Sequence, residues 1–318
     1  MRRSRGTMIS TRDAYGDALV ELGAINEDLV VLDGDVSTST RTSLFGEKYP
    51  KRFFNVGIAE QNMIAIAAGL AAVKKIPIAS SFACFCPSRC VDQIKQIVAQ
   101  LKLNVKIVST HCGLSAAADG ASHQAIEDIA IMRAMPNFTV TVPADALETN
   151  RTLRSIVSYD GPVYVRLSRA ESPVIFDEGY NYPLDKGVLI SDGSNLTLVA
   201  AGTMVSVALD AADTLKERGI SARVIDMHTI KPIDKKLVIE SANDTGAIIT
   251  VEDHSIIGGL GSAVAEVLVE NAPVPMTRIG IQDLFGESAR HYSELRSKFG
   301  LTEEHIVQEA ERLLKRKA

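Results

Sequence analysis

Residues 52–72 read RFFNVGIAEQNMIAIAAGLAA, and this succession of strand, turn and apolar helix sets the class of fold. Aromatic and β-branched residues at 53–58 predict a short strand, Gly57 marks a turn, and a helix follows from Glu60. Because residues 63–73 are apolar on every helical face, we expect this helix to have no solvent side. Glu60 is then drawn into a buried environment, where an ionised carboxylate needs a partner. That partner is a ligand or, more simply, the positive end of the helix dipole.

Strands and helices alternate on both sides of this stretch. This alternation predicts an α/β fold whose mostly parallel sheet carries helices on both faces. Ligands of such sheets bind at the carboxyl ends of the strands. Four features follow predicted strands and are expected to share one crevice: Asp35, the loop before Glu60, Phe82 and His111. The strands of this half are predicted at 29–32, 53–58, 76–80, 105–110, 139–142 and 163–167, with hydroxyl-rich and Gly/Ala-rich loops at 36–43 and 114–121 and a helix over 88–101.

A second α/β pattern follows a stretch rich in proline and glycine at 170–194, which predicts a domain boundary. We expect one domain over residues 1–180 and a smaller α/β domain over 190–318. The Gly258-Gly-Leu-Gly261 cluster looks like a phosphate loop, but it lacks the following Lys-Ser/Thr pair and the acidic residue of a dinucleotide site. Close packing of a helix is therefore the favoured interpretation of these glycines.

Composition excludes several classes of function. The 318 residues are 46% hydrophobic and 23% charged, which is ordinary for a globular protein. The net charge of −5, with both signs spread along the chain, disfavours nucleic acid and anionic membranes as partners. Lys74 and Lys75 interrupt the longest apolar run before it could span a bilayer. The basic residues at 1–7 lead into no apolar core, so we expect a short flexible start and a cytoplasmic protein.

The four cysteines, Cys84, Cys86, Cys90 and Cys112, fall within one segment beside His111. Their spacing lacks the paired Cys-x2-Cys knuckles of structural zinc sites. We therefore expect reduced thiols and no metal site on this chain.

A set of short motifs, taken in order along the chain, resembles the thiamine-diphosphate-dependent transketolases. The resemblance covers the pyrimidine-binding and C-terminal domains of that family, and the domain that holds the diphosphate and Mg2+ has no counterpart. Gly34-Asp35 followed by Asn62 imitates its metal signature, but the second glycine is missing and Asn62 lies in the predicted helix. The motifs are Ile9–Gly16, Leu32–Asp35, Ile58–Met63, Ser81–Phe85, Ser109–Gly113, Asp119–Ala125, Leu167–Arg169, Asp226–Pro232, Thr250–His254 and Gly258–Ala263.

The resemblance implies a split transketolase. Such an enzyme transfers a two-carbon ketol unit from a ketose phosphate to an aldose. A separate N-terminal subunit would carry the diphosphate and Mg2+, in an assembly of two copies of each subunit.

The resemblance also assigns roles near the cofactor. Glu60 corresponds to the carboxylate that bonds the ring nitrogen of the aminopyrimidine and so acts in catalysis. Phe82 and Phe85 correspond to aromatic residues that pack on that ring, while Asp35 and Val36 correspond to positions near the thiazolium. Without the resemblance, both phenylalanines would be assigned to the core.

Substrate contacts are implied in the same way. Arg12, Ser39, His111 and Arg169 correspond to residues around the phosphate of the sugar, where arginine forms charge-assisted hydrogen bonds. Asp119 and His123 correspond to residues that contact substrate hydroxyls, and His123 is placed to assist proton transfer.

Two departures from the family pattern stand out. Many members have Gly-Glu-Asp-Gly-Pro where this chain has Ala117-Ala-Asp-Gly-Ala121, so the substrate loop loses a carboxylate and a rigid proline. Cys112 stands where some members have an aspartate.

Other functions remain open at this point. The β subunit of a 2-oxoacid dehydrogenase shares the two-domain layout, but His111-Cys-Gly, residues 119–123 and the Arg12/Arg169 pair favour a phosphosugar. Deoxyxylulose-phosphate synthase usually keeps three domains in one chain. A non-catalytic partner subunit of the same fold has no need of the whole set of site residues.

Overall fold

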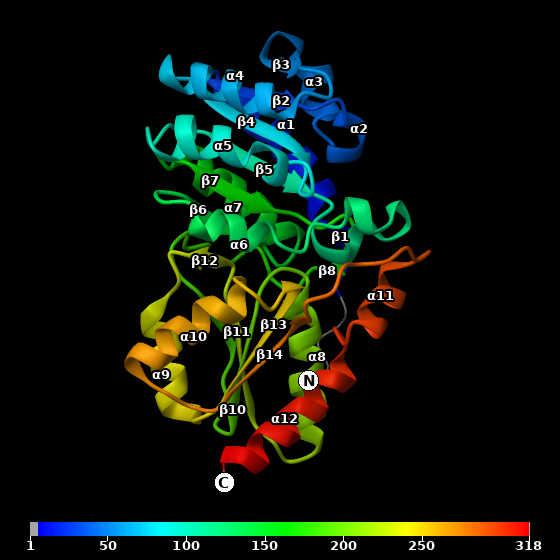
Figure 1. The fold of residues 1–318 in the computed structure, drawn as a ribbon, viewed down its shortest axis with the longest axis vertical. Coiled ribbons are helices and arrows are strands. Elements are labelled where there is room, and N and C mark those ends of the chain that lie inside the picture. Colours follow the sequence, from blue (N-terminus) through cyan, green and yellow to red (C-terminus); the bar gives the residue numbers. More distant parts are fainter. Residues whose placement is uncertain (1–5, 318) are drawn as a thin grey trace.

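Two β-sheets, one above the other in Figure 1, organise residues 6–317, which the computed structural model describes. The first five residues of the predicted flexible start lie outside the described residues. Within the described part of the chain, no helix is both long and apolar enough to cross a membrane.

The first sheet orders its strands β12-β6-β7-β5-β4-β2-β3, and every neighbouring pair is parallel except β12 with β6. Most of its central strands are buried along their whole length, as strands covered on both faces must be. Its strands are β2 (Leu29–Asp33), β3 (Phe53–Asn55), β4 (Ile76–Phe82), β5 (Lys106–Thr110), β6 (Thr139–Thr141), β7 (Val163–Arg166) and β12 (Thr229–Lys231).

Helices cover both faces of this sheet. On one face, α1 (Thr11–Ile25), α3 (Ser43–Lys48) and α7 (Ala146–Ser158) enclose a core that includes Tyr15 and Val108. On the other face lie α4 (Glu60–Ala72), the helical turns of residues 88–99, and α6 (Asp128–Ala134). Ser10 and Asp145 are the N-caps of α1 and α7, because their side chains accept from the backbone N–H three residues on.

The second sheet orders its strands β14-β13-β10-β11-β9, with β9 antiparallel at one edge. Helices α9 (Lys235–Thr245) and α10 (Leu260–Asn271) cover one face, and α8 (Met204–Glu217) and α12 (Glu303–Lys317) cover the other. The predicted α/β class is thus confirmed. The strands are β9 (Val188–Ser191), β10 (Leu196–Ala200), β11 (Ala222–Asp226), β13 (Ile248–Ser255) and β14 (Met276–Ile281), and α11 (Tyr292–Lys298) precedes α12.

Strand β12 crosses between the two halves of the chain. It lies between β11 and α9 in sequence, yet it pairs with β6 at the edge of the first sheet (Figure 1). One apolar core also runs from Ile107 in the first sheet to Ile225 in the second. The division at residues 180–190 stays a prediction, and the two halves share both a sheet edge and a core.

The structure corrects three local expectations. Residues 36–43 contain a helical turn, α2 (Ser37–Thr40), and η4 (Gly113–Asp119) consists of 3-10 turns interrupted by a kink at Ala117, so neither segment is wholly a loop. The expectation that the Glu60 helix has no solvent side is wrong for the single chain. Val73 just beyond its C-terminus is 68% exposed, and Ile66 on its outer face is 36% exposed. The sheet covers only one side of α4, and within the described residues nothing covers the other.

Candidate active site

Four aromatic side chains meet at the carboxyl edge of the first sheet. Phe82 ends β4 and His111 follows β5, its parallel neighbour, so the strand register brings the two rings together. Their centroids are 3.8 Å apart at 23°. Phe85 stacks beside Phe82 at 5.6 Å, and His123 meets Phe85 edge-on at 5.4 Å. The cluster presents flat apolar surface for a planar ring, and stacking there adds to the free energy of burial.

Glu60 begins α4 beside this cluster and is only 5% exposed. Arg89 Nη1 donates to Glu60 Oε1 at 3.2 Å, and the Arg89 Cζ lies 4.1 Å from the Phe85 ring centroid. The carboxylate thus sits at the positive end of a helix and beside a cation at once. Sequence reasoning missed Arg89, although its place four residues after Phe85 on a helical turn was a usable signal.

An unsatisfied hydroxyl lies in the same corner. Ser81 Oγ is buried and has no hydrogen-bond partner. A Cβ built at Gly34 would lie 3.5 Å from both this oxygen and Glu60 Cγ, so the end of β2 faces them at van der Waals distance. A buried hydroxyl without a partner is costly. The combination of an unsatisfied hydroxyl, a carboxylate and stacked rings fits a planar ring with several polar atoms, such as an aminopyrimidine.

The turn after β2 is stabilised by hydrogen bonds to the side chain of Asp33. Buried Asp33 accepts from Val36 N at 2.7 Å and from the hydroxyls of Thr40 and Thr42 at 2.7 and 2.8 Å. Asp35 has a left-handed backbone, with φ of 67°, and its carboxylate accepts from Asn55 Nδ2 at 2.8 Å. A non-glycine residue in this region is strained, and such strain persists where the surrounding structure enforces it.

Positive charge gathers on the other side of His111. Arg12 N donates to Ser168 O at 3.2 Å, which joins the start of α1 to the end of β7. Burial first, and then the charges of Arg41 and Arg169, lower the pKa of Arg12, against the opposing effect of Asp13. The Nε of Arg12 is buried without a hydrogen-bond partner. Its nearest carboxylate oxygen, Asp13 Oδ1, is 3.8 Å away, so this donor is free to bind an anion at hydrogen-bond distance.

His111 is neutral in this setting. Burial lowers its pKa to about 3, and the nearby charges of Arg12, Arg169 and His123 act in the same direction. Its backbone φ of 59° is left-handed. Ser39 lies in α2, which Arg41 ties to the first turn of α1 by an ion pair with Asp13 at 2.5 Å. The predicted phosphate residues therefore surround one edge of the sheet, from α1, α2, β5 and the end of β7.

The substrate loop predicted at Asp119 and His123 is anchored by contacts from both halves of the chain. Arg169 Nη1 donates to Asp119 Oδ2 at 2.8 Å, while Gln124 Nε2 donates to Glu287 O at 2.8 Å. At the start of the loop, Leu114 N donates to the Asp253 carboxylate at 3.1 Å. Sequence reasoning quoted Asp253 only within a motif and gave it no role.

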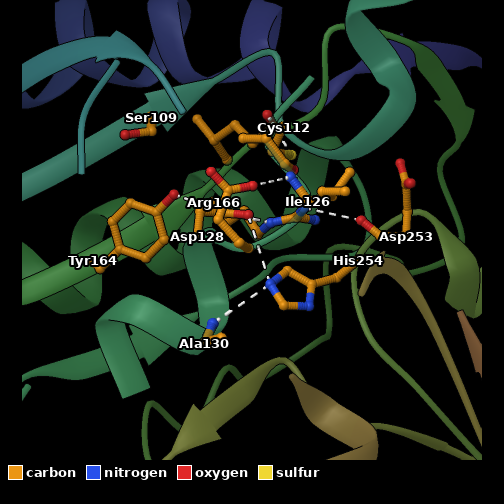
Figure 2. A network of polar contacts seen from close by, with 12 residues as sticks. Ser109, Cys112, Ile126, Asp128, Ala130, Tyr164, Arg166, Asp253 and His254 are labelled. Atoms are coloured by element: carbon orange, nitrogen blue, oxygen red, sulfur yellow. Dashed lines mark hydrogen bonds and ion pairs between the residues drawn. The ribbon is translucent and has the colours of Figure 1, made fainter. Parts of the chain in front are cut away.

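A buried ionic network continues from Asp253 (Figure 2). Arg166 Nε donates to Asp128 Oδ2 at 2.8 Å, and its Nη2 donates to Asp253 O at 2.9 Å. Tyr164 Oη donates to the same Asp128 oxygen at 2.7 Å. Burial lowers the pKa of His254 to about 4, and this ring accepts from Ala130 N at 3.4 Å. The network joins β7, α6 and β13 beneath the substrate loop.

The glycine cluster lies at the start of α10 and packs against side chains of the protein itself. Glu252 accepts from Leu260 N and Gly261 N, each at 2.7 Å, so its carboxylate occupies the positive end of the helix. A Cβ at Gly259 would lie 2.0 Å from Glu252 Oε2. Close packing is confirmed as the role of these glycines, and the phosphate alternative is excluded because the chain's own carboxylate fills the position.

All four cysteines are free thiols, three of them buried. Residues 6–317 contain no group of three or more His, Cys, Asp or Glu side chains placed to hold a metal ion. Desolvation raises the pKa of Cys84 and Cys112 to about 12, so both stay protonated at neutral pH.

The chain is similar to known proteins over nearly its whole length. Residues 7–174 match the family model of the transketolase pyrimidine-binding domain, and residues 185–306 match that of the transketolase C-terminal domain. A putative transketolase C-terminal section from Methanocaldococcus jannaschii is 48% identical over 310 residues, covering 96% of this chain and 97% of that protein.

Two further relatives are similar over nearly their whole length. A subunit of a 6-deoxy-6-sulfo-D-fructose transketolase from a Clostridium species is 43% identical over 306 residues, which cover 96% of this chain and 95% of that protein. A solved structure described as a split gene transketolase, inactive beta4 tetramer, superposes with a TM-score of 0.91 at 49% identity. It covers 98% of this chain and 100% of its own.

Proposed function

Because this chain belongs to the transketolase family, we propose that it is the catalytic half of a split transketolase that moves a two-carbon ketol unit from a ketose phosphate to an aldose. The observation that carries the proposal is buried Glu60 beside the stacked Phe82 and Phe85 rings at the carboxyl edge of the sheet. A carboxylate and flat rings at that edge suit a heteroaromatic cofactor.

Thiamine diphosphate is the cofactor that these residues fit, through its aminopyrimidine end. Phe82 and Phe85 would pack on the ring, Glu60 would share a proton with a ring nitrogen, and Asp35 and Val36 would border the thiazolium. When bound, this cofactor supplies the carbon nucleophile and the electron sink for cleavage of a carbon–carbon bond. The task of Glu60 is to hold that proton at its carboxylate, in a site from which the aromatic cluster excludes water.

The substrate is proposed to be a sugar that carries a terminal anion. Arg12, Ser39 and Arg169 would bind its phosphate, and neutral His111 would donate one hydrogen bond without adding charge. Asp119 and His123 would contact hydroxyls, with His123 moving a proton between substrate oxygens. The Clostridium relative is described as acting on a sulfo sugar, and a sulfonate is also a tetrahedral anion that arginine binds.

A partner subunit is proposed to complete the site. An exposed apolar face borders Glu60 and is formed by Ile58 at 77%, Ile66 and Val73. Exposed apolar side chains gathered along one segment are typical of a protein interface. The occupant would be an N-terminal transketolase subunit that carries the diphosphate and Mg2+, in an α2β2 assembly in the cytoplasm.

Reconstitution tests the proposal. The chain alone should show no ketol transfer, and adding the N-terminal subunit, thiamine diphosphate and Mg2+ should give transfer from a ketose phosphate to an aldose phosphate. Decarboxylation of 2-oxoacids by the same mixture would indicate a dehydrogenase β subunit instead. Cofactor binding without product from any sugar pair would indicate a non-catalytic subunit.

A further inference from the structure

Arg89 makes both of the contacts that the proposed function assigns to the aminopyrimidine. Its Nη1 donates to Glu60 Oε1 at 3.2 Å, and its Cζ lies 4.1 Å from the Phe85 ring centroid. Phe82 already lies parallel to Phe85, with 5.6 Å between ring centroids, which limits the ring surface left for another planar group.

A guanidinium and an aminopyrimidine resemble each other in shape and bonding. Both are planar and delocalised, both stack on aromatic faces, and both present N–H groups in the plane toward a carboxylate. A group 4.1 Å above a ring fills the stacking distance. The guanidinium and a pyrimidine therefore cannot occupy this position together.

We propose that Arg89 is a placeholder in the pyrimidine subsite. In the cofactor-free chain its guanidinium keeps Glu60 paired and covers Phe85, and it swings out when thiamine diphosphate enters. The inference rests on the proposed function, and it adds a competition between a side chain of the protein and the cofactor.

The surroundings of Arg89 allow its side chain to leave while its backbone stays. The side chain is 51% exposed, so its ion pair with Glu60 is weak. The backbone is fixed at both ends of the residue: Arg89 N donates to Phe85 O at 3.0 Å, and Gln61 Nε2 donates to Arg89 O at 2.9 Å. Rotation about side-chain bonds is sufficient to clear the subsite.

Calorimetric titration of thiamine diphosphate into the reconstituted complex, at saturating Mg2+, tests the placeholder. Arg89→Gln should bind the cofactor about two- to tenfold more tightly and associate faster, because a weak ion pair and a cation–π contact no longer compete. Arg89→Lys should lie between the variant and the natural chain, since it keeps the charge and loses the planar group. Arg154→Gln on α7, which pairs with Glu21, removes the same charge elsewhere and should leave binding unchanged.

Each outcome has one meaning. Weaker binding by Arg89→Gln would show a permanent cofactor contact, and unchanged binding would show a bystander; either overturns the inference while leaving the proposed function intact. Absence of binding by the natural complex would overturn both. A melting temperature for each variant, measured without cofactor, separates misfolding from a change in affinity.

Discussion

Glu60 and Asp253 are both buried carboxylates near the active edge of the first sheet, but their surroundings differ. Asp253 accepts from Leu114 N and from Tyr292 Oη at 2.9 Å, within a network that Arg166 and Asp128 continue. Glu60 has a half-exposed arginine for a partner and lies next to a buried hydroxyl with none. The Asp253 network draws its partners from buried groups of this chain, and one of its oxygens, Asp128 Oδ1, is buried without a hydrogen bond. The Glu60 carboxylate depends on a half-exposed side chain, which suits the proposed entry of a cofactor.

Replacing Glu60 is expected to have the largest effect on function. In the reconstituted complex, Glu60→Gln should lower kcat by about 10²- to 10⁴-fold, because a glutamine cannot hold the proton of the ring nitrogen. Unfolding of the variant in urea should stay close to that of the natural chain. The isosteric change Glu47→Gln on the exposed side of α3 is the control, and near-normal turnover by Glu60→Gln would remove the proposed role.

Breaking the buried network of Arg166, Asp128 and Asp253 should instead affect folding. Arg166→Met leaves Asp128 buried without its cation, and we expect about 3–5 kcal/mol less free energy of unfolding in urea. Arg218→Met removes an exposed pair with Glu311 and should cost less than about 1 kcal/mol. Equal losses of stability from the two substitutions would contradict the greater weight given to the buried pair of Arg166 and Asp128.

Arg169 should act on substrate affinity. Arg169→Gln is expected to raise KM for a ketose phosphate about tenfold and to change kcat less, because a charged hydrogen bond to the phosphate is lost at a partly exposed position. With an unphosphorylated ketose the variant and the natural enzyme should have the same KM. A similar loss with both donors would place Arg169 away from the phosphate.

The smallest expected effect is a pH dependence of stability from His111. Its folded pKa of about 3 lies below the usual value of 6.5, so the unfolded chain binds the proton first as pH falls. Its stabilising contribution is present above pH 6.5 and is lost on acidification toward pH 3. Between pH 6.5 and 5.5, the difference in unfolding free energy between the natural chain and His111→Asn should fall by about 1 kcal/mol. Urea unfolding at both pH values measures it, and a constant difference would contradict the burial of a neutral ring.

Local sequence predicted the elements better than the turns between them. The apolar run at 29–32 became β2, because four consecutive apolar residues of this kind favour a buried strand. Strand β12 escaped prediction because its three residues carry no period. The helical turns at 37–40 and 113–119 form through contacts with Asp33 and Asp253, which lie outside those segments or far from them in sequence.

For the candidate site too, the sequence predicted some of the residues and only the structure indicated the others. The motifs predicted roles for Glu60, Phe82, Phe85 and His111, and the structure brings these residues to one edge of the sheet, while their roles stay predictions. Arg89 lies outside every motif, and Ser81 lies within one without an assigned role, so the significance of both arises only from where the fold places them. Ser81 matters because its hydroxyl is left without a partner, and no sequence pattern reports an unmade hydrogen bond.

The sequence by itself determined that this chain is an α/β protein of the transketolase family, with helices on both faces of a mostly parallel sheet and a carboxylate at the start of an apolar helix. Those features depend on local propensity, burial period and motif order, all of which are written along the chain. Only the tertiary structure decided what surrounds that carboxylate. It placed Arg89 against Glu60 and Phe85 and left one face of α4 uncovered. It also joined Arg166 to Asp253, which are 87 positions apart in sequence, and contacts of that range exist only once the sheets have formed.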